Sequence, residues 1–171
     1  MGMYPAGNVI RVTPTVIAGT TENNDVAFNA TEIPNAVSSR GGCSRLRSVT
    51  IIDKDNEAHN MDLIFMQVQT NFGTAGSASS ITDANLEAAK VLGIQVVTWA
   101  NEASSIAQDS GTASIHTLSG GGGGNQVHGM PILFQAEGGS TSVYFTALVR
   151  EEAAWAATDD LEFVFHVEYL G

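Results

Sequence analysis

Acidic residues are clustered in several short segments of the chain, and clustered carboxylates can bind cations or act as acids and bases. Asp53, Asp55 and Glu57 alternate within a polar segment, as in the first half of a calcium-binding loop. A complete loop of that type also needs a glycine at its sixth position and a glutamate at its twelfth, and neither follows Asp53 at that spacing. We therefore expect a solvated turn here, with a weak cation site as the alternative.

Two acidic pairs occur further along the chain, Glu151-Glu152 and Asp159-Asp160, on either side of an alanine-rich segment that contains Trp155. Paired carboxylates serve glycoside hydrolysis, but adjacent residues within one loop rarely do so. We expect a solvated edge at these pairs. The tryptophan is either packed over the core or available as an anchor in an interface, and the sequence leaves both alternatives open.

The remaining residues with chemical potential are histidines and one cysteine. The histidines are scattered and form no ligand pattern such as His-Glu-x-x-His: His59, His116, His128 and His166. His116 and His128 flank a glycine run and could meet in space. Cys43 carries no sequence signature of a nucleophile. We predict no catalytic residue, no metal site and no cofactor, and we expect that the protein is not an enzyme.

The glycine run at residues 120–124 does not have the form of a phosphate-binding loop. Such a loop continues with lysine and then serine or threonine at the start of a helix, whereas Asn125 and Gln126 follow here. We expect a flexible tip between two strands.

The elements that would position these residues are mainly strands. Residues 46–52 and 61–70 are rich in β-branched and apolar side chains, and a polar turn joins them, which predicts a hairpin. Apolar residues of the second strand fall on both parities, whereas a half-buried strand alternates. We therefore expect this strand to be covered on one face by a second sheet and on the other by a helix, a loop or a neighbouring subunit.

Further strands follow from alternating patterns and turn residues: 8–18 (interrupted by Pro14, hence an edge strand or a strand with a break), 25–33, 94–100, 112–118, 130–136, 141–150 and 160–170. The convincing helix covers residues 82–92, with Thr82 as N-cap and Gly93 just past its end. The predicted fold is an all-β, antiparallel sandwich or jelly roll with one short helix. We expect an N-terminal arm at residues 1–8 and a single domain at 9–171.

The chain of 171 residues has a formal net charge of −11 and a pI of about 4.5. This acidity disfavours nucleic acid and anionic membranes as partners, because both attract Lys and Arg. It favours a basic protein surface. Charged residues make up only 15% of the chain, which suits a protein that packs against other proteins.

Residues 26–93 contain a recognisable order of short motifs. It begins with an Asn-Ala pair (29–30 or 35–36), a small-residue loop at 38–42 and the segment LRSVTIIDKDNEAHNMDLIFM. It continues with Phe72-Gly73, a Ser-Ile-Thr-Asp helix start at 80–83 and Lys-Val-Leu-Gly at 90–93. In this order the segment resembles a group of small virion proteins of tailed bacteriophages. Members of this group look like β-sandwich proteins that decorate, or cement, the capsid. The resemblance carries no site residues with it.

The resemblance implies a capsid decoration protein that binds the shell of the major capsid protein as a homo-oligomer, with three copies expected. It would reside on the capsid surface of the virion, and in the host cytoplasm during assembly. We predict interface contacts at Met3, Tyr4, Val9, Arg11 and Trp155. The alternative is a tail, baseplate or head-fibre module that binds a host glycan through Trp99 or Trp155. An enzyme of jelly-roll or cupin type using His116 and His128 is the least favoured hypothesis.

Overall fold

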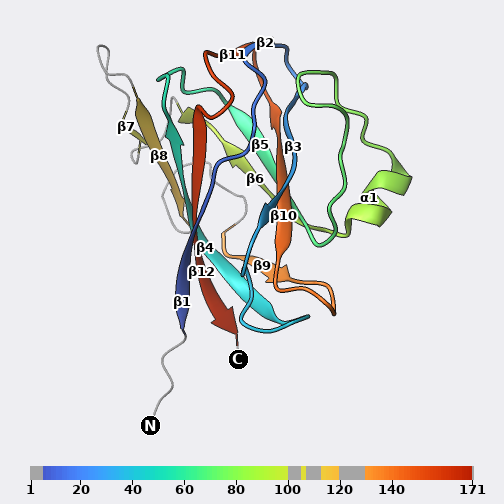
Figure 1. The fold of residues 1–171 in the computed structure, drawn as a ribbon. Helices are drawn as coiled ribbons and strands as arrows, with labels where there is room; N and C mark the ends of the chain where they lie inside the picture. Colours follow the sequence, from blue (N-terminus) through green and yellow to red (C-terminus); the bar gives the residue numbers. More distant parts are fainter. Residues whose placement is uncertain (1–5, 100–104, 107–112, 120–129, 171) are drawn as a thin grey trace.

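The computed structural model describes residues 6–99, 105–106, 113–119 and 130–170, which form two antiparallel sheets packed face to face (Figure 1). The first sheet has the strand order β1-β12-β4-β8-β7, and β9 also pairs with β4. Its strands are β1 (Gly7–Val12), β4 (Cys43–Asp53), β7 (Ser105–Ile106), β8 (Ser114–Ser119), β9 (Ile132–Gln135) and β12 (Leu161–Leu170). Among the described strands, β1 pairs only with β12 and ends at Val12, before Pro14, so it is an edge strand, one of the two alternatives that Pro14 allowed.

The second sheet has the order β3-β10-β5-β6. Its strands are β3 (Val26–Ile33), β5 (Met61–Met66), β6 (Val91–Val97) and β10 (Val143–Val149). A separate ladder joins the short strands β2 (Gly19–Thr21) and β11 (Ala153–Trp155), which the sequence did not predict. The helix α1 (Asp83–Ala89) completes the fold, and the predicted all-β sandwich with one short helix is confirmed.

The core lies between the two sheets and is built around phenylalanines from both of them. Phe163 and Phe165 point inward from β12, and Phe145 of β10 packs edge-on against both, with ring centroids 5.0 and 4.9 Å apart. Phe28 of β3 and Phe65 of β5 extend this cluster. All five side chains are fully buried, so this contact fixes one sheet on the other.

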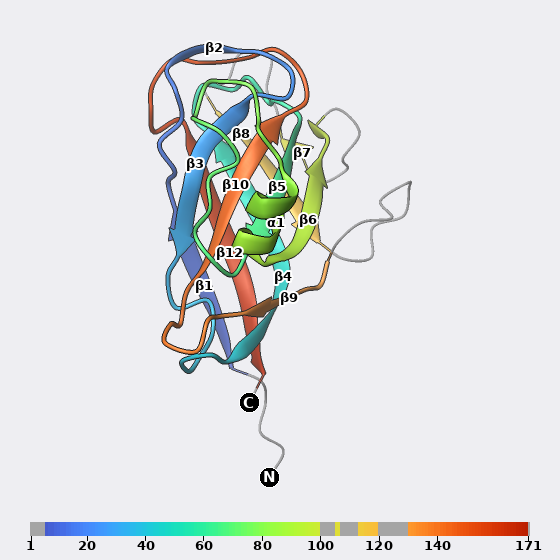
Figure 2. The same cartoon turned by 90° about the vertical axis from the view of Figure 1, so that its right-hand side faces the viewer.

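Strand β5 is covered on both faces, as its sequence pattern predicts. Leu63 and Phe65 belong to the core between the sheets, whereas Ile64 and Met66 face outward into a second cluster with Phe72 and Ala89. The outward cover comes from the chain itself: α1 lies over the second sheet in Figure 2. The segment between β5 and α1 adds Phe72 to it.

The predicted hairpin between residues 46–52 and 61–70 is wrong. β4 belongs to the first sheet, where it pairs with β12, β8 and β9, and β5 belongs to the second, where it pairs with β10 and β6. Residues 54–60 cross from one sheet to the other. Packed sheets lie only about 10 Å apart, so a polar connection of this length spans them as readily as it closes a hairpin.

The helix begins as predicted and ends earlier than predicted. The Oγ1 atom of Thr82 accepts a hydrogen bond from the backbone N–H of Asn85, at 3.2 Å, which makes Thr82 the N-cap. The helix ends at Ala89, because Lys90 adopts a left-handed conformation with φ of 49°. Strand β6 starts at once with Val91, so Gly93 lies within a strand and not at the helix end.

Candidate functional site

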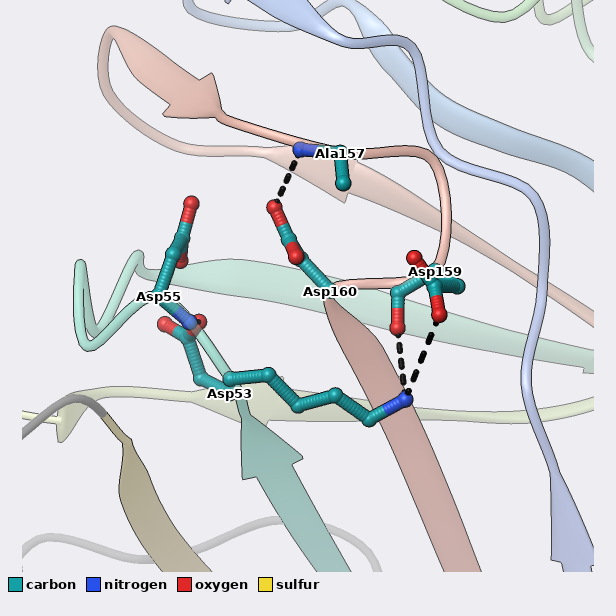
Figure 3. Close-up of polar contacts among 6 residues, drawn as sticks. Asp53, Asp55, Ala157, Asp159 and Asp160 are labelled. Carbon is teal, nitrogen blue, oxygen red and sulfur yellow. Dashed lines mark hydrogen bonds and ion pairs between the residues drawn. The ribbon is translucent and has the colours of Figure 1, made fainter.

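Two acidic segments that are far apart in the sequence meet at one end of the sandwich, which we call the acidic end (residues 53–60 and 150–160). Figure 3 shows Asp53, Asp55, Asp159 and Asp160 gathered there. Strand pairing brings them together, because Asp53 at the end of β4 is the cross-strand partner of Leu161, the first residue of β12. Nothing local in the sequence shows this meeting, since it depends on β4 pairing with β12.

The two buried carboxylates of the acidic end are used to hold backbone. Asp53 is fully buried, and its Oδ2 atom accepts a hydrogen bond from the N–H of Ala58 at 2.6 Å. Its Oδ1 atom accepts a longer one from the N–H of Asp55, at 3.3 Å. Asp160 accepts from the N–H of Ala157 at 2.6 Å. Side chains that bond to nearby backbone in this way stabilise turns.

Further contacts tie the two segments to each other. The carboxylate of Asp55 accepts a hydrogen bond from the N–H of Ala156, at 3.0 Å. Glu151 accepts one from the N–H of Asn60 at 2.7 Å, and Lys54 donates from Nζ to the carbonyl of Asp159 at 2.8 Å. The loops of the acidic end therefore form one cross-linked unit, which keeps its charges in fixed positions.

Asp55 is the carboxyl group that this arrangement perturbs. Burial raises its pKa above the ordinary value of 3.8, a hydrogen bond with the side chain of Asp53 raises the pKa further, and the N–H of Ala156 acts in the opposite direction. The folded protein therefore holds this proton more tightly than the unfolded chain. Asp55 lowers stability as the pH rises through the interval between its ordinary and its raised pKa.

Carboxylates at this end are arranged for turn stabilisation more than for cation binding. Among the residues that the structure describes, no group of three or more His, Cys, Asp or Glu side chains is placed to hold a metal ion. Asp53 directs its oxygens at loop N–H groups, and Glu57 is exposed. The alternative of a weak cation site at Asp53, Asp55 and Glu57 therefore gains no support from the geometry.

Trp155 lies under the acidic end, in the core. Its side chain is 2% exposed, and the ring of His59 packs edge-on against it, with centroids 5.6 Å apart and an interplanar angle of 86°. The Nε2 atom of His59 accepts a hydrogen bond from the N–H of Ala154 at 3.0 Å, which fixes β11. Of the two alternatives for Trp155, the structure shows the packed one. The predicted interface contact at Trp155 is therefore not available to its side chain.

The structure describes two of the four other predicted interface residues. Val9 and Arg11 lie on β1 with exposed side chains, and Arg11 forms an ion pair with Glu162 at 2.6 Å. Met3 and Tyr4 fall outside the described residues. Val9 and Arg11 thus remain surface candidates at the edge of the first sheet, and they share no surface with the buried Trp155.

The remaining residues singled out from the sequence do not form a site with the acidic end. His116 is buried on β8 against Trp99, with ring centroids 5.0 Å apart, and burial lowers its pKa to about 4. His128 and the glycine run lie outside the described residues, so the predicted meeting of His116 with His128 falls there too. Cys43 is half-buried at the start of β4.

Charge is what distinguishes the acidic end from the rest of the molecule. It holds seven of the 18 acidic residues and, apart from Arg150 where it meets β10, a single cation, Lys54. The acidic residues are Asp53, Asp55, Glu57, Glu151, Glu152, Asp159 and Asp160. Arg150 is already engaged in an ion pair with Asp62 of β5. An unbalanced, fixed negative surface of this kind attracts a basic surface.

In the parts of the chain that the structure describes, no helix is long and apolar enough to cross a membrane. Comparison of the sequence with models of known protein families finds no match, and comparison with curated proteins finds none either.

Proposed function

We propose that this chain is a structural virion protein that decorates the capsid of a tailed bacteriophage. It binds the shell of major capsid proteins as a homo-oligomer and stabilises that shell, on the virion surface and from assembly in the host cytoplasm onward. The observation that carries the proposal is the fixed acidic end, taken together with the resemblance of residues 26–93 to head-associated virion proteins.

The acidic end suits docking onto a basic protein surface. Glu57, Glu152 and Asp159 are exposed there, while the buried Asp53 and Asp160 hold the loops in place. Because the loops are held, docking does not have to order them, and the associated entropy cost is small. Complementary charge speeds encounter and fixes the orientation of the bound protein.

Stabilisation would come from burial at junctions between shell subunits. A stable protein interface buries about 1,600 Å² in total, which is within reach of a domain of this size. A copy that contacts two neighbouring shell subunits resists their separation by the internal pressure of packaged DNA. The sandwich supplies a rigid body through which such a contact transmits force.

The glycan-binding alternative gains no support from the two tryptophans. Stacking on a sugar needs an exposed aromatic face, and Trp99 and Trp155 are 5% and 2% exposed.

Capsid binding is tested with purified protein and capsids that lack it. Glu57→Gln together with Glu152→Gln should lower capsid occupancy several-fold at low salt, because two exposed charges of the acidic end are lost. The matched control is Asp83→Asn with Glu87→Gln, which removes two exposed charges from α1. Equal occupancy for the two double variants, or no binding by the wild type, would contradict the proposal.

A further inference from the structure

The first sheet has an outer face that the described parts of the chain leave uncovered, which we call the open face. It is formed by the side chains that β1, β12, β4, β8 and β9 direct away from the second sheet. Val9, Ile115 and Leu133 are 56%, 40% and 52% exposed on it. Figure 1 shows this sheet and α1 on opposite sides of the molecule, so the chain's own helix covers the other sheet instead.

Polar side chains lie near the centre of the open face. Thr50 of β4 and Thr117 of β8 are cross-strand partners whose hydroxyl oxygens lie 2.9 Å apart. Ser48 and His166 form the adjacent pair, with Oγ and Nδ1 3.0 Å apart. These pairs satisfy each other within the sheet, so a second surface can lie over them without leaving the four groups unbonded.

The charge of the open face is opposite in sign to that of the whole chain. It carries Arg11, Arg45 and Arg47 of β1 and β4 against Glu162 and Glu168 of β12, a net charge of +1 in a chain of −11. Both glutamates already face arginines, Glu162 with Arg11 at 2.6 Å and Glu168 with Arg47 at 3.5 Å. The open face therefore lacks the excess of carboxylates that the rest of the chain carries, so two copies that meet here do not bring strongly negative surfaces together.

We propose that two copies of this chain pair through their open faces. The pairing deepens the homo-oligomer part of the proposed function and leaves the acidic end free for the shell. A basic shell is not attracted to a face with a net positive charge, whereas a second copy of the same face can place each Glu168 against an Arg45. Pairing by the same face on both copies is the two-fold arrangement most common in homo-oligomers.

The positions of the charges select one orientation of the pair. Glu168 of β12 and Arg45 of β4 are cross-strand partners in the same row of the sheet. A two-fold axis parallel to the strands lays β12 of one copy over β4 of the other, and each Glu168 then faces Arg45 of the second copy. A two-fold axis perpendicular to the strands would instead lay β12 of one copy over β12 of the other. Glu162 of each copy would then face Glu168 of the other copy, and the two carboxylates repel each other.

The projected area of the open face is somewhat below that of a standard interface. Four strands about 4.8 Å apart, from 6 residues in β1 to 11 in β4 at about 3.4 Å each, cover on the order of 500 Å² in projection. Side-chain relief adds to this figure, and a standard interface buries about 800 Å² on each partner.

The first test is the solution mass of the purified protein by light scattering, at concentrations up to about 100 μM. The pairing predicts two chain masses, in place of the three copies that the resemblance led us to expect. A single chain mass throughout this range would overturn it, and so would three chain masses. Capsid binding is measured separately, so the proposed function can fail while the pairing stands, and the reverse.

The decisive test uses two charge reversals on the open face. Arg45→Glu alone sets two glutamates against each other at both contacts between copies, and Glu168→Arg alone does the same with two arginines. Each should raise the dissociation constant by about 100-fold or more. An equimolar mixture of the two variants should restore pairing, because both contacts between unlike copies are then attractive.

Recovery on mixing cannot come from contacts within one chain, so it isolates the interface between copies. The matched controls are Lys90→Glu and Glu137→Arg, which reverse the charges of an exposed ion pair of 2.7 Å that joins the end of α1 to the turn after β9. Both controls should keep two chain masses. Variants that melt like the wild type but show no recovery on mixing would overturn the proposed orientation and the pairing with it.

Discussion

The two outer faces of the sandwich differ in what their side chains require. On the second sheet, Ile64, Met66 and Leu148 point outward, and α1 with the segment before it buries them. On the first sheet, hydroxyl and charged side chains point outward and bond to each other across strands, and the apolar Val9, Ile115 and Leu133 stay exposed among them. A cluster of outward apolar residues is covered by the same chain, whereas a face of mixed polarity folds without a cover and stays available to another molecule.

The helix α1 and the segment before it, which together form the cover of the second sheet, stabilise that sheet and are stabilised by it. A helix as short as α1 is not stable by itself in water, so the burial of Ala89 against the sheet is what keeps it folded. In return, each large apolar side chain removed from water on this face contributes about 1.5–3 kcal/mol. On the open face, Val164 is buried at 5% exposed in the single chain, whereas Val9, Ile115 and Leu133 stay exposed.

The largest effect should come from removing a covering side chain. Phe72 is fully buried in the outer cluster, and Phe72→Ala should lower the free energy of unfolding by about 3–5 kcal/mol. The matched change on the open face is Val164→Ala, which should cost only about 1–2 kcal/mol, since fewer apolar atoms are lost. Urea unfolding followed by circular dichroism measures both. A cost below about 2 kcal/mol for Phe72→Ala would contradict the burial of Phe72 in the covered face.

The contrast between the faces was partly visible in the sequence. Apolar residues on both parities of β5 predicted a strand covered on both faces, and the structure confirms it. The alternating pattern at residues 160–170 predicted a strand, and the structure shows β12 there with its phenylalanines pointing inward. Hydrophobic periodicity is a local property, so it can be read from the chain. The strand pairing is not local, and the predicted β4–β5 hairpin failed for that reason.

The acidic end shows the same limit. Asp53, Asp55 and the pair Asp159-Asp160 were each identified as acidic segments, but their meeting depends on β4 pairing with β12 over more than 100 positions. The ladder of β2 and β11 was missed because each strand has only 3 residues, too few for an alternating pattern. Without that ladder, the burial of Trp155 could not be decided from its alanine-rich surroundings.

Lowering the pH should have an intermediate effect on the free energy of unfolding. This effect distinguishes the inward face of the first sheet, where His116 lies, from its outward face. His116 points into the core from β8, and burial lowers its pKa to about 4, whereas the unfolded chain takes up this proton near pH 6.5. The unfolded state therefore binds more protons between these values, and stability falls as the pH falls through them. By pH 5 the loss should be about 2 kcal/mol relative to pH 7.

This pH dependence should disappear in one variant and persist in another. His116→Leu removes the buried titrating group, so the difference in unfolding free energy between pH 7 and pH 5 should shrink by most of that amount. His166→Asn replaces the histidine on the open face of the same sheet, and this variant should keep the difference in unfolding free energy between the two pH values. An unchanged pH dependence in His116→Leu would show that His116 is not the group responsible.

The smallest effect concerns the end of the cover. Lys90 adopts a left-handed conformation that costs a residue with a side chain about 1 kcal/mol, and its ammonium group pairs with Glu137 at an exposed position. Lys90→Gln removes the ion pair but keeps the strain, and Lys90→Gly removes both. Lys90→Gly should therefore be more stable than Lys90→Gln by about 0.5–1 kcal/mol, as measured by urea unfolding. If glycine gives no advantage over glutamine, backbone strain at Lys90 does not limit the stability of the covered face.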